Sequence, residues 1–160
     1  MTKKIPLTQG KVALVDDDDF EWINQWKWYC SHDYAARPYG KWPHQHKIWM
    51  HREINHTPDG YETDHINNNS LDNRRSNLRT CKHSENVKNR SLGRDNTSKY
   101  KGVTWHKASK KWAAQIGAHN LHFHLGLFST AGEAAKAYDE AALKKFGKFA
   151  KINFPSNNYD

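Results

Sequence analysis

The chain has 160 residues, of which 26% are charged, and a mean hydropathy of −1.04. This length allows one or two small domains rather than one large core. No apolar run approaches the roughly 20 residues that a membrane helix needs, so we expect a soluble, cytoplasmic protein with no membrane partner. The opening residues, MTKKIPLTQGKV, lack the apolar centre of a signal peptide.

The net charge of +8 is unevenly distributed along the chain. Residues 1–73 carry 8 Lys and Arg against 11 Asp and Glu, a net charge of −3, whereas residues 74–160 carry 17 against 6, a net charge of +11. The basic half is a candidate surface for a polyanion such as nucleic acid. A solvated basic face that only aids solubility explains the composition equally well.

Residues 5–59 contain short β-prone segments separated by Pro and Gly. The predicted strands are Lys11–Val15, Trp26–Ser31, Asp33–Arg37 and Lys47–Glu53. Five tryptophans would supply bulk for a small core, namely Trp22, Trp26, Trp28, Trp42 and Trp49. The acidic run Asp16–Asp19 could bind a metal, but a solvated turn before a strand or short helix is commoner.

Residues 61–92 are rich in His, Asn, Asp and Arg and poor in apolar residues. This segment cannot build its own core, so something else must hold it, and a bound metal is one possibility. The small, polar residues that follow predict a linker over 93–99. The two cysteines, Cys30 and Cys81, form no CxxC motif, which argues against a thiolate zinc site or zinc-ribbon adaptor.

Residues 100–155 predict an independent module. Its alternating strands are Tyr100–Trp105, Lys111–Gly117 and Leu121–Phe128. Thr130 and Glu133 fit a capping box, so a helix should follow to about Phe146 and end at Gly147. The many alanines of this helix would let the sheet approach it closely.

The adjacent pair Asp64-His65 lies in the segment that is dense in polar residues. On a strand the two side chains would point to opposite faces, so a bulge or a strand end is needed for both to serve one site. Asn77 follows His65 by twelve residues, and Asn86 follows Asn77 by nine. Histidine can activate water near neutral pH, and carboxylate and amide oxygens suit Mg²⁺. The residues alone thus indicate a site formed by carboxylate and amide oxygens and a histidine imidazole, in a segment rich in arginine.

This pattern closely resembles the HNH endonucleases of phage genomes and group I introns. The matching residues are Asp64-His65, the run Leu71–Arg79, Asn86 and Asn89. The resemblance covers roughly residues 5–90. It implies a ββα-metal (His-Me finger) fold in a domain of residues 1–92, with two strands, a loop and then a helix over residues 61–90.

The resemblance also implies roles for individual residues. His65 would be the general base that activates water, Asp64 a metal ligand and Asn86 the second ligand of one Mg²⁺ or Mn²⁺ ion. Asn77 would pin the loop and orient the histidine. His83 would contact the scissile phosphate, or replace Asn86 as ligand. Two roles are equally possible for Arg74, Arg75 and Arg79: contact with a phosphate, or a charge in solvent. For Arg79 a third alternative is binding to carbonyl groups of the loop.

The C-terminal module resembles the APETALA/ethylene-response-factor DNA-binding domain. Shared residues include Tyr100–Val103, Lys111–Ala114, Glu133–Ala135, Ala137–Asp139 and Asn153–Pro155. The resemblance implies a three-stranded antiparallel sheet that enters the major groove, packed on one helix. We expect an α+β protein with two modules.

Strand alternation divides this module into two faces. The groove face would carry Thr104, His106, Gln115, Gly117, His122 and His124, with Lys107, Lys110 and Lys111 placed to contact phosphates. The opposite face would carry Val103, Trp105, Trp112, Ala114, Ile116, Phe123 and Leu125, toward the helix or the core rim. His119, His122 and His124 could form a zinc site, but simple exposure is the commoner outcome.

The sequence therefore predicts a homing-type endonuclease that hydrolyses duplex DNA, as a monomer or weak dimer without a small-molecule cofactor. The alternative is a non-catalytic, sequence-specific DNA-binding regulator with a relic HNH fold. The intact set Asp64, His65, Asn77 and Asn86 argues against that alternative.

Overall fold

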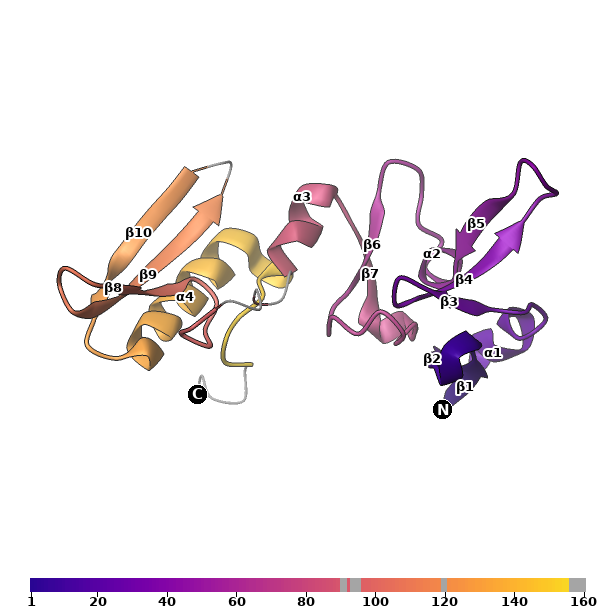
Figure 1. Cartoon of the computed structure of the whole chain (residues 1–160), viewed down its shortest axis with the longest axis horizontal. Helices are drawn as coiled ribbons and strands as arrows, with labels where there is room; N and C mark the ends of the chain where they lie inside the picture. Colours follow the sequence, from indigo (N-terminus) through magenta and orange to yellow (C-terminus); the bar gives the residue numbers. More distant parts are fainter. Residues whose placement is uncertain (90–91, 93–95, 119–120, 156–160) are drawn as a thin grey trace. The chain divides into compact units, whose positions relative to one another are not determined.

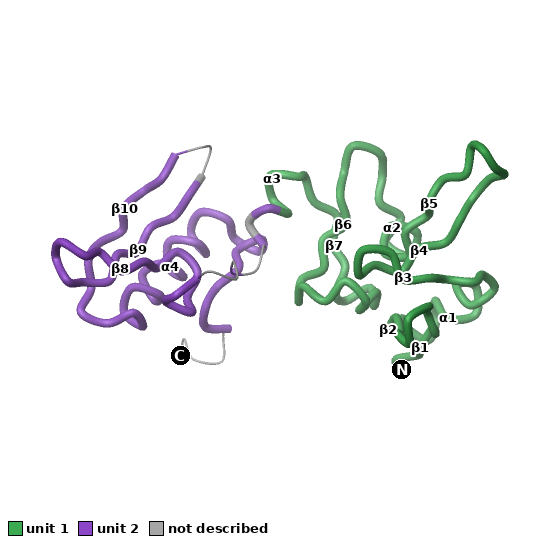
Figure 2. Tube along the Cα trace, in the orientation of Figure 1, with its two compact units in different colours: residues 1–86 green, residues 87–160 purple. Residues whose placement is uncertain are grey.

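The structure, a computed structural model, describes residues 1–89, 92, 96–118 and 121–155 (Figure 1). The chain divides into two compact units, residues 1–86 and residues 87–160 (Figure 2). Residues 93–95 of the predicted linker lie outside the described residues.

The first unit begins with an antiparallel hairpin and a short helix. Strand β1 (Thr2–Pro6) pairs with β2 (Val12–Asp16) through the 3-10 turn η1 (Thr8–Gly10), and α1 (Asp17–Ile23) follows directly. The sequence analysis predicted β2 but not β1. Because Ile5 is the only buried residue of β1, the strand carries little alternation of apolar and polar residues.

A three-stranded antiparallel sheet follows in the order β3 (Tyr29–Ser31), β4 (Tyr34–Tyr39), β5 (His46–Trp49). The strand predicted over Lys47–Glu53 is wrong in its second half, where α2 (Met50–Ile54) forms instead. Met50 and Ile54 are both fully buried, and their spacing of four residues places them on one face of a helix. Burial of both side chains thus favours a helical turn here.

The core of this unit gathers side chains from most of its elements. It contains Ile5, Leu7, Ala13, Val15, Ile23, Trp28, Cys30, Ala35, Met50, Ile54 and Leu78. The tryptophans contribute unequally, which corrects the expectation that all five fill the core. Trp28 is 5% exposed, whereas Trp26 and Trp42 are 49% and 87% exposed.

The polar segment forms two antiparallel strands and a helical turn. Strand β6 (Glu62–His65) pairs with β7 (Leu78–Cys81), with η2 (Arg75–Asn77) before β7 and α3 (His83–Asn86) after it. The connecting loop is docked on β2: Leu14 N donates to Leu71 O and Asn73 N donates to Leu14 O, each at 2.8 Å. Backbone hydrogen bonds to β2 therefore help to hold this segment in place. The sequence analysis had named a bound metal as one possible support.

The second unit contains one three-stranded antiparallel sheet and one long helix. After η3 (Val87–Asn89), the strands β8 (Val103–His106), β9 (Lys111–Ala118) and β10 (Leu121–Phe128) pair in the order β10-β9-β8. Helix α4 (Ala131–Phe146) contacts all three strands, and η4 (Gly147–Phe149) follows it. The predicted capping box is confirmed, with Thr130 and Glu133 each bonding the other's backbone. The alanines Ala134, Ala135 and Ala142 are fully buried, as close packing of helix on sheet requires.

The fold is therefore mixed α+β, as predicted. None of the helices in the described part of the chain combines the length and the apolar character needed to cross a membrane.

Candidate functional site

His65 is the last residue of β6 and is only 6% exposed. Its Nε2 lies 3.3 Å from Oδ1 of Asn73. Its ring packs against two others, with centroids 5.2 Å from His51 on α2 and 5.9 Å from Tyr34 on β4. Burial lowers the pKa of His65 below its ordinary value, although Asn73 and the charge of Asp64 oppose that shift. The imidazole is therefore neutral at neutral pH, the form that can accept a proton.

Asp64 is 5% exposed and faces β7. One of its carboxylate oxygens accepts hydrogen bonds from Nε and a terminal nitrogen of Arg79, at 2.8 Å and 2.5 Å. His65 instead packs on α2 and β4, so the two neighbours lie on opposite sides of the strand, as alternation requires. His65 ends β6, so the expected strand end is present, but the two side chains still point to opposite sides of the strand.

Asn77 is 7% exposed and fastens the loop between β6 and β7. Its Oδ1 accepts from the backbone N of Asn67 at 3.0 Å, and its Nδ2 donates to the carbonyl of Asp72 at 2.7 Å. This geometry agrees with the predicted loop-pinning role. The ring of His65 is hydrogen-bonded instead to Asn73, whose Oδ1 accepts from Nε2 and whose side chain is fully buried. The sequence analysis included Asn73 only within the matching run Leu71–Arg79, and its pairing with His65 had no sequence signal.

His83 and Asn86 on α3 both bind Glu62. The Nδ1 of His83 lies 2.7 Å from Oε1 of Glu62, and the Nδ2 of Asn86 donates to Oε2 at 2.7 Å. The hydrogen bond from Asn86 and then that from His83 lower the pKa of Glu62. The carboxylate is therefore ionised at neutral pH. Glu62 was not among the predicted site residues, although it lies two positions before Asp64.

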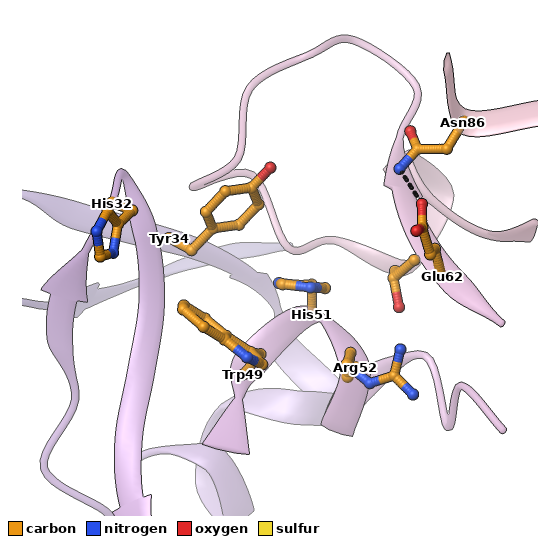
Figure 3. A pocket seen from close by; sticks show the side chains of 8 residues that line it. His32, Tyr34, Trp49, His51, Arg52, Glu62 and Asn86 are labelled. Carbon is orange, nitrogen blue, oxygen red and sulfur yellow. Dashed lines mark hydrogen bonds between the residues drawn. The ribbon is translucent and has the colours of Figure 1, made fainter. Parts of the chain in front are cut away.

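A cavity of about 430 Å³ lies beside this cluster. Figure 3 shows its lining from β4, β5, α2, β6 and α3, including Tyr34, Trp49, His51, Glu62 and Asn86. His51 is 8% exposed, and its Nδ1 has no hydrogen-bond partner in the described structure. Burial, followed by the charge of His65, lowers the pKa of His51 to about 3. Sequence reasoning missed His51 because it placed this segment in a strand.

The three arginines predicted to contact phosphate each pair with a carboxylate of the same unit. The pairs are Arg74 with Asp72, Arg75 with Asp19 and Arg79 with Asp64, at 2.6 Å, 2.6 Å and 2.5 Å. Asp19 is 1% exposed, so the acidic run is not simply the solvated turn that was expected. The arginine side chains remain 36%, 50% and 14% exposed, and phosphate contact stays a prediction for all three.

The oxygen donors near β6 and α3 suit a hard cation. They are the carboxylate of Asp64 and the amide of Asn86, the ligand types that Mg²⁺ prefers while it keeps several waters. No cluster of three His, Cys, Asp or Glu side chains that could hold a metal occurs among the described residues. A metal site here would therefore need the Asn86 amide and water. Arg79 would also have to share Asp64 with the ion.

The predicted groove face of the second unit is exposed. Its members are Thr104, His106, Gln115, Gly117, His122 and His124, with Lys107, Lys110 and Lys111 beside them. In the β9–β10 register, Gln115 pairs with His124 and Gly117 pairs with His122, so these residues share one face. His119 of the possible zinc site lies outside the described residues.

The opposite face packs on α4 as predicted. Val103, Ala114 and Ile116 are buried there. Trp105 and Phe123 are 44% and 42% exposed and lie at the rim, where Trp105 contacts Trp112 and Lys145 covers the ring of Phe123. A register shift between His124 and Gly126 interrupts the alternation of β10.

Two families of known proteins match separate segments of the chain. Residues 98–148 match the AP2 domain family, and residues 55–88 match an HNH endonuclease family. The chain carries an HNH endonuclease segment and an AP2 domain. Both resemblances noted in the sequence are thereby confirmed.

Similar curated proteins are plant transcription factors. The AP2-like ethylene-responsive transcription factor PLT2 of Arabidopsis thaliana is 51% identical over 65 residues, 39% of this chain and 11% of its own length. The AP2-like ethylene-responsive transcription factor AIL7 of the same plant is 49% identical over 63 residues, which are 38% of this chain and 13% of AIL7. APETALA2-like protein 2 of Oryza sativa subsp. indica is 40% identical over 73 residues, which are 46% of this chain and 17% of that protein. The matches thus span under a fifth of the length of these relatives.

Proposed function

We propose that this protein is a metal-dependent DNA endonuclease of the homing type, in which the HNH segment cuts and the AP2 domain positions it on duplex DNA. The observation that carries the proposal is the buried imidazole of His65, hydrogen-bonded to Asn73 and next to Asp64, within the segment that matches the HNH endonucleases. The succession of β6, loop, β7 and α3 supports a ββα-metal fold for this segment.

His65 would act as the general base. Its ring accepts a proton from a water molecule, which attacks the phosphorus in line with the departing 3′ oxygen. The ring contacts with His51 and Tyr34, and the hydrogen-bonding distance to Asn73, hold the imidazole in one orientation. The expected products carry a 5′-phosphate and a 3′-hydroxyl.

Asp64 and Asn86 would hold one Mg²⁺ or Mn²⁺ ion through oxygen atoms. When bound, such an ion neutralises charge that develops on the phosphate and on the departing oxygen. His83, 80% exposed at its side chain, could reach a phosphate from α3. A single centre cuts one phosphodiester, so a monomer would nick one strand.

The AP2 domain would supply the choice of site. Thr104, His106, Gln115, His122 and His124 on the exposed sheet face would read base edges, while Lys107 and Lys110 bind phosphates. Tethering the two units in one chain raises the local concentration of the catalytic unit near the bound DNA.

The test incubates supercoiled plasmids with the protein and Mg²⁺ or Mn²⁺, beside a His65→Ala variant. His46→Ala is a matched control, because His46 is an exposed histidine on β5. We expect nicking by the wild type and by His46→Ala, and its loss in His65→Ala. Sequence-specific binding without cleavage by any of the three would favour the relic regulator instead. Equal cleavage by His65→Ala would remove His65 from the role of base.

A further inference from the structure

Glu62 occupies a specific place between β6 and α3. It lies two residues before Asp64, so both carboxylates lie on the same face of β6. Each oxygen of Glu62 is engaged by a different side chain of α3: Oε1 by Nδ1 of His83 and Oε2 by Nδ2 of Asn86, both at 2.7 Å. Figure 3 shows the contact with Asn86 at the wall of the cavity. One carboxylate therefore fixes both α3 residues that compete for the role of second ligand.

This contact determines which end of the Asn86 amide faces Glu62. An ionised carboxylate only accepts hydrogen bonds, so the amide must present its NH₂ to Oε2. The opposite orientation would place the amide oxygen against a carboxylate oxygen and lose a charge-assisted bond. The Oδ1 of Asn86 is consequently turned away from Glu62. Oδ1 is also the only atom of this side chain that can ligate a hard cation.

We propose that Glu62 is a positioning residue that orients Asn86 so that its Oδ1 can ligate the divalent cation shared with Asp64. The inference rests on the metal site of the proposed function and adds a residue to it. In this proposal Glu62 acts through Asn86, since each of its oxygens accepts a hydrogen bond from a side chain of α3. Carboxylates that hold metal ligands in this way change metal affinity by about 10–100-fold when they are removed.

A role for Glu62 in merely stabilising α3 makes a different prediction. The first turn of α3 already has its own acceptor, since the backbone N of Lys82 donates to Oε2 of Glu85 at 2.8 Å. Glu85 therefore offers a matched control, a carboxylate on the same helical turn that accepts from Lys82 N, whereas the Asn86 side chain donates to Glu62. Glu62→Gln and Glu85→Gln remove the same charge from the same region.

The experiment measures Mn²⁺ binding by the full chain without DNA, from the electron paramagnetic resonance signal of free Mn²⁺. We expect Glu62→Gln to weaken Mn²⁺ binding by about 10-fold or more, because glutamine has one neutral acceptor oxygen and cannot hold both His83 and Asn86 with charge-assisted bonds. Glu85→Gln should bind like the wild type. Glu62→Asp keeps both acceptor oxygens on a shorter side chain, and should restore part of the affinity even if the glutamine variant folds poorly.

The same substitution in an Asn86→Ala background separates positioning from charge. If Glu62 acts through Asn86, Glu62→Gln causes no further loss of Mn²⁺ affinity in that background. An equal loss in both backgrounds means that Glu62 acts by its charge, and it overturns the inference. Wild-type protein that binds Mn²⁺ and cleaves DNA, with Glu62→Gln unchanged, overturns this inference alone. Wild-type protein that binds no Mn²⁺ overturns it as well, while plasmid cleavage then still reports on the nuclease proposal.

Discussion

Arg79 and Asp64 face each other across the β6–β7 pair, and two nitrogens of the guanidinium bind one oxygen of the carboxylate. The side chains are 14% and 5% exposed, so solvent screens this pair only weakly. The proposed metal ligand is thus neutralised by a neighbouring cation in the structure. Arg79 has a structural role that is independent of any contact with DNA.

Replacement of Arg79 by Met should destabilise the first unit by about 3 kcal/mol, because a buried carboxylate loses its partner. Native-state hydrogen exchange of the β6 and β7 amides measures this loss separately from the second unit. The double variant with Asp64→Asn should lose less than the sum of the single changes, since the uncompensated charge is then absent. Additive losses would show that the pair contributes no coupling energy.

The loop contacts of Asn77 lead to a second prediction. Asn77→Ala removes one bond from the backbone of Asn67 and one to the carbonyl of Asp72, and it leaves those backbone groups to find new partners. We expect a cost of about 1–3 kcal/mol and slower DNA cleavage, because Asn73 and His65 belong to the same loop and strand end. Thermal unfolding and plasmid nicking measure the two effects. The exposed Asn24, at the end of α1, supplies a control in Asn24→Ala, and equal effects of both changes would contradict the prediction.

The second unit could be predicted closely because its signals are local. Alternation within β9 and β10, the capping box at Thr130 and Glu133, and Gly147 after the helix each depend on residues close together in the chain. The boundaries of β10 and α4 agree with the sequence prediction. Trp105 and Phe123 lie at the rim of the predicted face, since alternation gives the direction of a side chain but not how far the core extends.

The first unit was predicted less well because its site depends on tertiary contacts. Asp19 and Arg75 are separated by 56 positions, and nothing near either residue indicates their pairing. His51 joins His65 only because α2 replaces the end of a predicted strand. The spacing that identified Asp64, His65, Asn77 and Asn86 comes from a motif. Their neighbours Glu62, Asn73 and His51 become visible only once the chain is folded.

A third prediction concerns acid pH and the buried His51. Its pKa is about 3 in the folded protein against an ordinary value of 6.5, so the unfolded chain binds the proton first as the pH falls. Stability of the first unit should therefore fall as the pH decreases from about 7 toward 4, by at most about 1.4 kcal/mol per pH unit for this group. The lowered pKa of His65 acts in the same direction.

Hydrogen exchange protection in the first unit at about pH 7 and about pH 5 measures this slope. His51→Leu removes one of the two titrating groups and should flatten the pH dependence, whereas the exposed His46→Leu should leave it unchanged. A slope that is identical in the wild type and His51→Leu would show that His51 is not the source.

The fourth prediction tests the packing of the AP2 domain at Gly102. Its φ of +74° lies in the left-handed region, and a Cβ added there would lie 2.0 Å from the ring of Tyr138 and 2.7 Å from the carbonyl oxygen of Gln115. Tyr138 is 5% exposed, and its ring packs with Ile116 and Ala142, so it cannot simply move outward. The backbone oxygen of Gln115 is fixed within β9. Gly102→Ala should therefore cost more than the roughly 1–2 kcal/mol of a left-handed backbone alone, on the order of 3 kcal/mol.

Gly132→Ala is the matched control, because Gly132 lies in the first turn of α4 and an added Cβ would meet nothing within 4 Å. Alanine is a better helix former than glycine, so this change should leave stability equal or slightly higher. Binding of the full chain to duplex DNA should weaken in Gly102→Ala and persist in Gly132→Ala. Because the damage is confined to the second unit, hydrogen exchange of β6 and β7 should be unaffected in both variants. Loss of protection in β6 and β7 in Gly102→Ala would mean that the two units depend on each other for stability.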